Sequence, residues 1–519
     1  MSVVHRLTLG DVLDEHRRGR PLGTAVVDGP VRLTYPELDD RVDRLAGALA
    51  ADGVRAGERV LWLGQNSFRV LELLLACARL GAIFCPANWR QSADELAHVL
   101  DDLAPAVVVW EEGSGGGVSR EEVEKARGAG PGGQVSPDAR WVRSGEEYEA
   151  YVAAAAPLTA SVPASEAGTD AGAPVLALYT AAFDGRPNAA LLSHSALIAH
   201  SMALLHIRQM EDGFTFLACG PLFHVGTMMF TLAAFQIGGK LVFTPAYEPA
   251  EVCRLIETER CTQAFLFGPM IDGLVEANKD RAYDLSSLRF VSHSAEWDEM
   301  ISVDDSPWCA SKMGGYGQTE VGGMLTFLGL GMGGAGFAGR TSPLAHVRLL
   351  DAEGNEVPPG EVGEICARGQ NVFSGYWNRP ELNEAKTAGG WHHTGDLGRR
   401  EPDGTLTFIG PRLRMIKSAN ENIYPAEVER ALKSHPAIAD AAVIGVPDER
   451  FGQSPKAVVV LAEGAAATAE EVIEHVRGEI ASYKKPRHVE FADAIPKKGY
   501  TPDYDALDER YGGGGYPGS

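Results

Sequence analysis

Seven residues in the middle of the chain, Gly314-Gly315-Tyr316-Gly317-Gln318-Thr319-Glu320, combine the side chains that a nucleotide site requires. The tyrosine ring can stack on a base, the threonine hydroxyl can donate to a phosphate oxygen, and the glutamate can bind Mg²⁺. The glycines let backbone N–H groups approach a ligand closely. The same composition also suits an ordinary glycine-rich turn, so the rest of the chain must decide between these interpretations.

Two further motifs follow this segment, and their order and distances carry a family resemblance. They are His393-Thr394-Gly395-Asp396-Leu397-Gly398-Arg399 and Glu421-Asn422-Ile423-Tyr424-Pro425-Ala426-Glu427-Val428-Glu429. With them the chain resembles the adenylate-forming superfamily of acyl-CoA synthetases, luciferases and adenylation domains along almost its whole length. The resemblance implies an α/β fold with a large N-terminal domain, residues 1–410, of stacked and mostly parallel sheets with helices. A small, mobile α+β lid domain, residues 411–519, would follow it.

The resemblance also assigns roles to individual residues. Tyr316 would stack on adenine, Thr319 would contact the α-phosphate, Glu320 would bind Mg²⁺, and Asp396 would accept hydrogen bonds from both ribose hydroxyls. His224 falls in a stretch that lines the acyl pocket of the superfamily, although a lone histidine among apolar residues also suits a structural role. The predicted catalytic residues are thus Thr319, Glu320 and His224, and the predicted cofactor-binding residues are Thr180, Arg186, Ser294, Ala295, Tyr316, Gly317, Thr319, Asp396 and Arg412.

The first departure from the superfamily lies in the phosphate-binding loop, which falls on Thr180 to Ala190. The superfamily carries there a Ser/Thr/Gly-rich run that ends in Pro-Lys-Gly and holds the β- and γ-phosphates of ATP. Thr180 and Arg186 keep the pattern, whereas Asn188 stands at the lysine position. Asp184 adds a carboxylate that repels a triphosphate unless Mg²⁺ or Arg186 compensates its charge.

The second departure concerns the hinge at Phe408 to Lys417, about which the lid rotates between two half-reactions. Arg412 stands one step beyond the usual arginine, and Arg414 replaces the usual hinge acid. Beyond the hinge, Ala419 and Asn420 replace a Gly-Gly pair that borders the pantetheine tunnel of thioester-forming members. Side chains there would narrow the tunnel, which leaves the use of CoA open. ATP and Mg²⁺ are the expected cofactors.

The third departure lies close to the C-terminus. The superfamily places a Gly-Lys pair there, whose ammonium group bridges the carboxylate and the α-phosphate as charge builds in the transition state. In this chain the two positions hold Thr501 and Pro502. Lys497 or Lys498 could substitute for the missing lysine if the loop were reshaped.

Three functions remain open on these residues. The first is an ATP-dependent ligase that releases AMP and pyrophosphate and activates a carboxylic acid, of the acyl- or aryl-CoA ligase type. The alternative is an ATP-dependent diazotase that activates nitrite for transfer to an aromatic amine without CoA. The second alternative is a non-catalytic nucleotide-binding relative, in which the intact Tyr316, Thr319, Glu320 and Asp396 would serve no chemistry.

Composition narrows the partners and the compartment. A formal charge of -23 argues against nucleic acid, whose phosphates require clustered Lys and Arg, and against an anionic membrane surface. The seven cysteines are scattered without a Cys-x-x-Cys pair. This pattern predicts reduced thiols that bind no metal, in a cytoplasmic protein. No leader or membrane-spanning run is visible in the sequence. The expected partners are therefore a small-molecule acid or an aryl amine, with a homodimer as a further expectation from the family.

Local sequence patterns in the N-terminal third predict the helices and strands of the domain that must position these residues. Thr34 and Glu37 form a predicted capping box before a helix, and apolar Arg59–Leu63 predicts a buried strand followed by a helix over Arg69–Leu80. Apolar strands alternating with helices are typical of a parallel sheet. Glu111–Ala139 is rich in Gly and polar residues and predicts an exposed excursion, and Gly512–Ser519 predicts a disordered tail.

Overall fold

The chain divides into two compact units. The first comprises residues 1–333, 339–346 and 367–392, and the second comprises residues 334–338, 347–366 and 393–519. The computed structural model describes residues 3–91, 93–113, 120–128, 138–158, 168–180, 187–304, 315–327, 338–418, 421–480, 484–498 and 501–516. The predicted division into domains at residue 410 stays a prediction.

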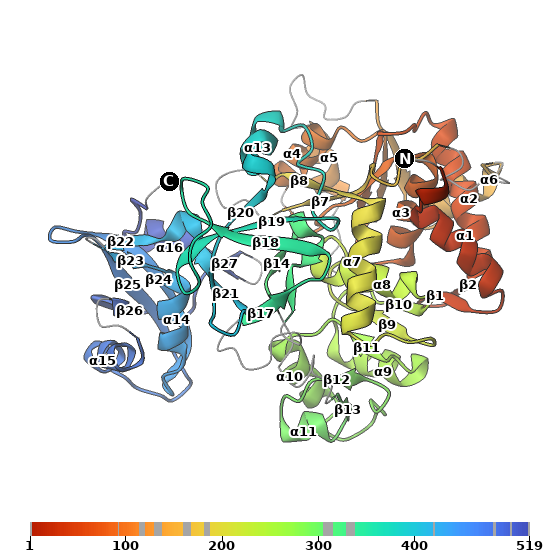
Figure 1. The fold of residues 1–519 in the computed structure, drawn as a ribbon. Helices are drawn as coiled ribbons and strands as arrows, with labels where there is room; N and C mark the ends of the chain where they lie inside the picture. The colour runs from red at the N-terminus through yellow and green to blue at the C-terminus, as the bar shows by residue number, and fades with distance from the viewer. Residues whose placement is uncertain are drawn as a thin grey trace. The chain divides into compact units, whose positions relative to one another are not determined.

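A six-stranded sheet of the first unit, of which Figure 1 labels β7 and β8, has the order β6-β5-β3-β4-β7-β8. Its strands are β3 (Arg59–Leu63), β4 (Ile83–Pro86), β5 (Val107–Trp110), β6 (Arg140–Arg143), β7 (Pro174–Tyr179) and β8 (Ala189–Ser193). Neighbouring strands run parallel except β7 and β8, which are antiparallel. Val60 and Trp62 face one core while Leu61 and Leu63 face another, because successive side chains of a strand point to opposite faces. The predicted buried strand is therefore confirmed.

A five-stranded sheet of the same unit has the order β11-β9-β10-β1-β2. Its strands are β1 (Thr24–Asp28), β2 (Val31–Thr34), β9 (Thr215–Ala218), β10 (Lys240–Phe243) and β11 (Gln263–Ala264). All of its pairs run parallel except β1 with β2. Val26 and Leu241 contribute to the central core, and their neighbours Val27 and Val242 contribute to the outer one. Both sheets are mostly parallel, as predicted.

Helices cover both faces of the two sheets. The helices of this unit are α1 (Leu9–Gly19), α2 (Tyr35–Ala51), α3 (Phe68–Leu80), α4 (Ala93–Leu103), α5 (Arg120–Gly128), α6 (Glu146–Ala154), α7 (His194–Ile207), α8 (Val225–Gln236), α9 (Pro249–Glu259), α10 (Gly268–Ala277), α11 (Ala295–Asp298) and α13 (Pro380–Lys386), with the 3-10 turns η1 (Val3–His5), η2 (Thr319–Val321) and η4 (Ala388–Gly390). One core joins a face of each sheet with α1, α2, α3, α7 and α8. The outer face of the first sheet packs on α4 and α5, and that of the second packs on α9 and α10. The result is a layered α/β arrangement.

Short strand pairs and a capping box complete this unit. The pairs are β12 (Arg289–Phe290) with β13 (Ser302–Val303), β14 (Gly317–Gln318) with β15 (Gly323–Met324), and β16 (Thr326–Phe327) with β17 (Ala338–Thr341). At the start of α2, the Glu37 carboxylate accepts from Thr34 N at 2.7 Å, and the Thr34 hydroxyl accepts from Glu37 N at 3.4 Å. This is the predicted capping box.

Among its described residues, the second unit holds strands of two larger sheets, a short hairpin and three α-helices. Strands β18 (Ala345–Leu350), β19 (Val362–Gly369), β20 (His392–Arg400) and β21 (Leu406–Pro411) are neighbours in that order, and the turn η5 (Arg412–Arg414) follows. The other sheet has the order β23-β22-β25-β24, with β26 beside β25. Its strands are β22 (Ile416–Ser418), β23 (Glu421–Ile423), β24 (Ile438–Asp448), β25 (Gly452–Leu461) and β26 (His488–Phe491). Helices α14 (Pro425–Lys433) and α15 (Ala469–Glu479) pack on one face, and α16 (Tyr504–Tyr511) packs on the other, after the hairpin of β27 (Lys497–Lys498) and β28 (Thr501–Pro502).

Two expectations about exposed segments were wrong. The stretch Glu111–Ala139 contains α5, whose Val123 and Ala126 are buried in a core because they lie three residues apart on one helix face. In the C-terminal segment, Tyr516 is buried. The Tyr516 hydroxyl accepts from Gly445 N at 2.9 Å and donates to Asp508 at 2.8 Å.

No helix within the described ranges is both long enough and apolar enough to span a membrane.

Candidate functional site

The glycine-rich segment folds into a tight hairpin, and steric or backbone constraints explain why glycine stands at two of its positions. An added Cβ at Gly317 would lie 1.9 Å from the carbonyl oxygen of Gly323, so the paired strands β14 and β15 leave no room for a side chain. Gly322 ends η2 with a φ of 72°, a left-handed conformation that suits glycine. Gly314 lies outside the described residues. The hairpin thus sets the position of Tyr316 before it and of Thr319 within η2.

Tyr316 is held at both its backbone and its ring. Its backbone N donates to the Thr326 hydroxyl at 2.9 Å. Its own hydroxyl accepts from Gln318 Nε2 at 3.1 Å, and Gln318 Oε1 lies 2.9 Å from His392 Nε2. The ring is 5% exposed. A chain of three polar side chains therefore fixes the orientation of the ring that is predicted to stack on adenine.

Glu320 is a buried carboxylate, and among the described residues its side chain accepts a hydrogen bond from Tyr376 alone. The hydroxyl of Tyr376 donates to Glu320 Oε1 at 2.7 Å, while Phe373 N donates to the Glu320 carbonyl at 2.8 Å. Burial raises the pKa of Glu320, and the bond from Tyr376 lowers it in part. Thr319 beside it is half-buried. An anionic oxygen in such surroundings suits the hard cation Mg²⁺, so these residues fit the predicted metal role.

Asp396 lies in β20 and is positioned by its neighbours in the chain. Its backbone N donates to the Thr394 hydroxyl at 3.1 Å, and that hydroxyl donates to the carbonyl of Ile365 in β19 at 2.6 Å. Gly395 between them has a φ of 79°, which requires the conformational freedom of glycine. Asp396 itself is half-buried, and it pairs with Pro411 across β20 and β21.

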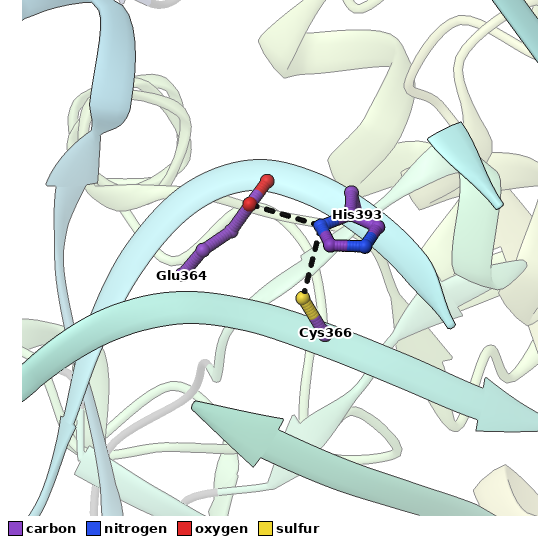
Figure 2. A group of neighbouring side chains, drawn as sticks. All are labelled: Glu364, Cys366 and His393. Atoms are coloured by element: carbon purple, nitrogen blue, oxygen red, sulfur yellow. Dashed lines mark hydrogen bonds and ion pairs between the residues drawn. The ribbon is translucent and has the colours of Figure 1, made fainter. Parts of the chain in front are cut away.

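A second buried carboxylate, Glu364 of β19, collects the donors around Asp396. Gly395 N donates to its Oε1 at 2.9 Å, and His393 Nδ1 and Arg412 Nη1 each lie 3.0 Å from its Oε2. Figure 2 shows Glu364 and Cys366 pointing toward the same His393 nitrogen, with Cys366 Sγ at 3.4 Å. The three ligand atoms lie within 4.8 Å of one another and form a candidate metal group. Arg412 reaches this carboxylate from η5 with 57% of its side chain exposed.

The phosphate loop is described only at its two ends. Thr180 N donates to the carbonyl of Asn188 at 3.0 Å, which closes the base of the loop. Arg186 lies outside the described residues. Asn188, at the expected lysine position, accepts from Arg379 Nε at 2.9 Å, and Arg379 Nη2 is paired with Asp102 at 2.7 Å. A cation is thus present beside Asn188, although it comes from a residue 191 positions away.

Three other predicted residues have local structural roles. His224 is the N-cap of α8, where its Nδ1 accepts from Gly226 N at 3.1 Å. Ser294 is the N-cap of α11 and accepts from Trp297 N at 3.2 Å, and the exposed Ala295 is the first residue of that helix. Capping does not exclude contact with a ligand, so their predicted roles in the site stay predictions.

The position of the missing lysine lies in the hairpin of β27 and β28, where Pro502 pairs with Lys497. Both neighbouring lysines are paired with carboxylates. Lys497 Nζ lies 2.9 Å from Asp440, and Lys498 Nζ lies 3.0 Å from Asp505. Arg414, at the hinge-acid position, is paired with Asp505 and Asp508 of α16. Ala419 and Asn420 lie outside the described residues.

Several site residues were missed from the sequence because their partners lie far along the chain. Tyr376 is 56 residues from Glu320, and His392 is 74 residues from Gln318. Glu364 is 31 residues from Gly395 and 48 from Arg412. A charged residue inside the run 362–367 of β19, where the other residues are apolar or glycine, was the one signal that could have identified Glu364 as buried and paired.

Comparisons with known proteins agree over nearly the whole chain. The sequence model of the family described as "AMP-binding enzyme" matches residues 13–377, and that of "AMP-binding enzyme C-terminal domain" matches residues 427–500. A feruloyl-CoA synthase of Amycolatopsis sp is 35% identical over 93% of this chain and 95% of its own length. An indoleacetate–CoA ligase of Aromatoleum aromaticum is 34% identical over 95% of each chain. The structure of ATP-bound MatB from Rhodopseudomonas palustris superposes with a TM-score of 0.81 at 25% identity, over 97% of this chain and 99% of that one.

Proposed function

The chain belongs to the family of AMP-binding enzymes, and from this premise we propose that it is an ATP-dependent acid–CoA ligase that releases AMP and pyrophosphate. The observation that carries the proposal is the hairpin of Tyr316, Thr319 and Glu320, in which the ring and the carboxylate are each held by a dedicated partner. Such preorganisation of nucleotide-binding groups is typical of a site that performs chemistry.

We infer an aromatic carboxylic acid as the substrate class. Two relatives at 35% and 34% identity carry names that refer to feruloyl and indoleacetate acyl groups, both of which contain an aromatic ring. In the first half-reaction, an oxygen of the acid attacks the α-phosphorus of ATP, an acyl–phosphate bond forms, and pyrophosphate leaves. In the second, the sulfur of CoA attacks the acyl carbon and AMP leaves.

Each predicted residue has its own task in this proposal. Tyr316 would stack on adenine in the orientation that Gln318 gives it. Glu320 would hold Mg²⁺, which neutralises phosphate charge as the pyrophosphate departs. Asp396 would bind the ribose hydroxyls, and Arg412 would supply a cation near the nucleotide. Pro502 contributes no charge, so in this proposal the acid is activated without the lysine of the superfamily.

The departures at Pro502 and in the phosphate loop keep nitrite activation as an outcome of the test. Both lysines of the last hairpin are paired with carboxylates, which leaves the reaction without the usual carboxylate-binding ammonium. The relatives named above are CoA-linked enzymes and lend no support to a diazotase. A non-catalytic relative would bind the nucleotide and turn over nothing.

The deciding experiment measures AMP release from ATP over a panel of aromatic and aliphatic acids, each with and without CoA, and over nitrite with aryl amines. We expect AMP formation that requires an aromatic acid, with an acyl-CoA product detected by mass spectrometry. Glu320→Gln should lower the rate by roughly 10²-fold. Glu276→Gln, an exposed glutamate of the same unit that pairs with Lys279, is the matched control and should leave the rate unchanged. AMP release that requires nitrite, or nucleotide binding without any AMP formed, would overturn the proposal.

A further inference from the structure

We propose that Glu364 is the positioning residue of the nucleotide site in the second unit, because one carboxylate holds both the turn that carries Asp396 and the side chain of Arg412. The inference rests on the proposed function in that it takes Asp396 and Arg412 as nucleotide ligands. Glu364 itself would not touch the nucleotide.

The first part of the argument is the grip on the turn. Glu364 Oε1 accepts from Gly395 N at 2.9 Å, next to Asp396 in the chain. Gly395 is in a left-handed conformation with a φ of 79°, so the direction of the next residue depends on a backbone that is intrinsically permissive. A bond to a buried carboxylate restrains that backbone. The bond from the Thr394 hydroxyl to Ile365 braces the same turn from the adjacent residue of β19.

The second part is the grip on Arg412. Its Nη1 lies 3.0 Å from Glu364 Oε2, while 57% of the arginine side chain remains exposed. An exposed arginine has many rotamers, and ordering it for a ligand costs free energy at the moment of binding. A pairing with a carboxylate that is 6% exposed lowers that cost, because one nitrogen of the guanidinium is already placed. Within the described residues the guanidinium has no other hydrogen bond, so its remaining N–H groups would be available to a ligand.

The third part is the charge of the cluster, which argues for a hydrogen-bond hub rather than a metal centre. Glu364, Cys366 and His393 supply ligand atoms within 4.8 Å of one another (Figure 2). However, the two oxygens of Glu364 already accept from Gly395, His393 and Arg412, and the guanidinium compensates the carboxylate charge. A cation at the centre would have to displace Arg412 and compete with it for the same oxygen. The donors present therefore favour positioning over metal binding.

The test measures AMP affinity by calorimetry and the KM for ATP and for the acid, in the full-length protein. Glu364→Gln keeps the size of the side chain and an acceptor for Gly395, but it removes the charge that holds Arg412. We expect AMP to bind about tenfold more weakly and the KM for ATP to rise, with the KM for the acid unchanged. A general loss of folding would lower the concentration of active enzyme, and so the maximal rate, without raising the KM for ATP alone.

The matched control is Glu429→Gln. Glu429 is also a buried glutamate of the second unit, 8% exposed, but it holds Val443 N and the Tyr504 hydroxyl instead of the predicted nucleotide ligands. This variant should lower the melting temperature and leave the AMP affinity unchanged. Equal losses of AMP affinity in both variants would overturn the positioning role.

Arg412→Ala keeps the proposal falsifiable if Glu364→Gln folds poorly, because the exposed arginine can be removed without opening a core. We expect Arg412→Ala to weaken AMP binding. Glu364→Gln should weaken AMP binding less in the Arg412→Ala protein than in the wild-type protein, because the effects of substitutions at two contacting residues are not additive. Full additivity, or wild-type affinity in Arg412→Ala, would overturn the inference. If the wild-type protein binds AMP but activates no acid, the proposed function fails while the binding measurements still decide the role of Glu364.

Discussion

At the scale of single residues, the hydroxyl of Tyr376 donates to the carboxylate of Glu320, which is predicted to bind Mg²⁺. Removing this hydroxyl tests the predicted metal role of Glu320. Tyr376→Phe removes the donor at 2.7 Å from Glu320 and leaves the ring in place. A hydrogen bond to a charged group contributes about 1.5–3 kcal/mol, so we expect the KM for Mg²⁺–ATP to rise by roughly tenfold or more. Steady-state kinetics at fixed free Mg²⁺ would measure this change, and an unchanged KM would place the metal elsewhere.

The same variant predicts a shift in pH dependence. Burial raises the pKa of Glu320, and Tyr376 opposes part of that rise, so removing the hydroxyl should raise the pKa further. The charged form of Glu320 is present above its pKa and is the form that binds Mg²⁺. The acid limb of the rate profile should therefore move to higher pH in Tyr376→Phe. A limb that stays in place would assign it to another group.

Pro502 lacks the positive charge of the lysine that the superfamily places at this position. Pro502→Lys restores an ammonium group at the end of a hairpin whose own lysines are bound to Asp440 and Asp505. If the hairpin reaches the reacting atoms, acid adenylation should rise by at least about tenfold, as expected for charge placed beside a developing anion. Pyrophosphate release is the measurement, with Pro496→Lys in the same segment as a control for added charge. No rise in Pro502→Lys would mean that the hairpin does not reach the site.

At the scale of an element, the hairpin of β14 and β15 depends on glycine for its close backbone approach. Gly317→Ala would place a Cβ 1.9 Å from a carbonyl oxygen, so the strands must separate and carry Tyr316 and Thr319 with them. We expect AMP affinity to fall by roughly tenfold or more, and stability to fall by about 1–3 kcal/mol. Gly19→Ala is the control, because Gly19 ends α1 with nothing within 4 Å of an added Cβ. Calorimetry measures the AMP affinity and thermal unfolding measures the stability. Equal changes in Gly317→Ala and Gly19→Ala would contradict the prediction.

At the scale of the whole molecule, a buried ionic network stabilises the first unit through helices α2, α3 and α6. Glu72 is fully buried and accepts from Arg41 Nε at 2.6 Å and from the Tyr148 hydroxyl at 2.5 Å. Arg41 also reaches Glu149 at 2.7 Å. Glu72→Gln removes the charge of a fully buried carboxylate, while the half-buried Arg41 keeps Glu149, so we expect a loss of about 1.5–3 kcal/mol in the free energy of unfolding. Urea unfolding measures it, and AMP affinity below the transition should be unchanged; a parallel loss of affinity would show that the network also shapes the site.

Much of the fold was predictable from local patterns. The apolar run Arg59–Leu63 became β3, the Thr34–Glu37 capping box started α2, and the motif of Tyr316 to Glu320 formed a turn between short strands. The packed helix α5 and the buried Tyr516 were missed, because their burial comes from distant elements and their local composition is polar or glycine-rich. A cytoplasmic location and a homodimer stay predictions.

The sequence by itself determined which family the chain resembles and which residues are predicted to carry its nucleotide chemistry, since residue types, spacing and periodicity are properties of short segments. The tertiary structure decided which groups hold those residues in place. Glu364 gathers donors from β20 and η5, Tyr376 reaches Glu320, and Arg379 meets Asn188 across 191 positions. These contacts depend on which strands become neighbours in a sheet, and that order is set by packing of the whole chain rather than by any one of its segments.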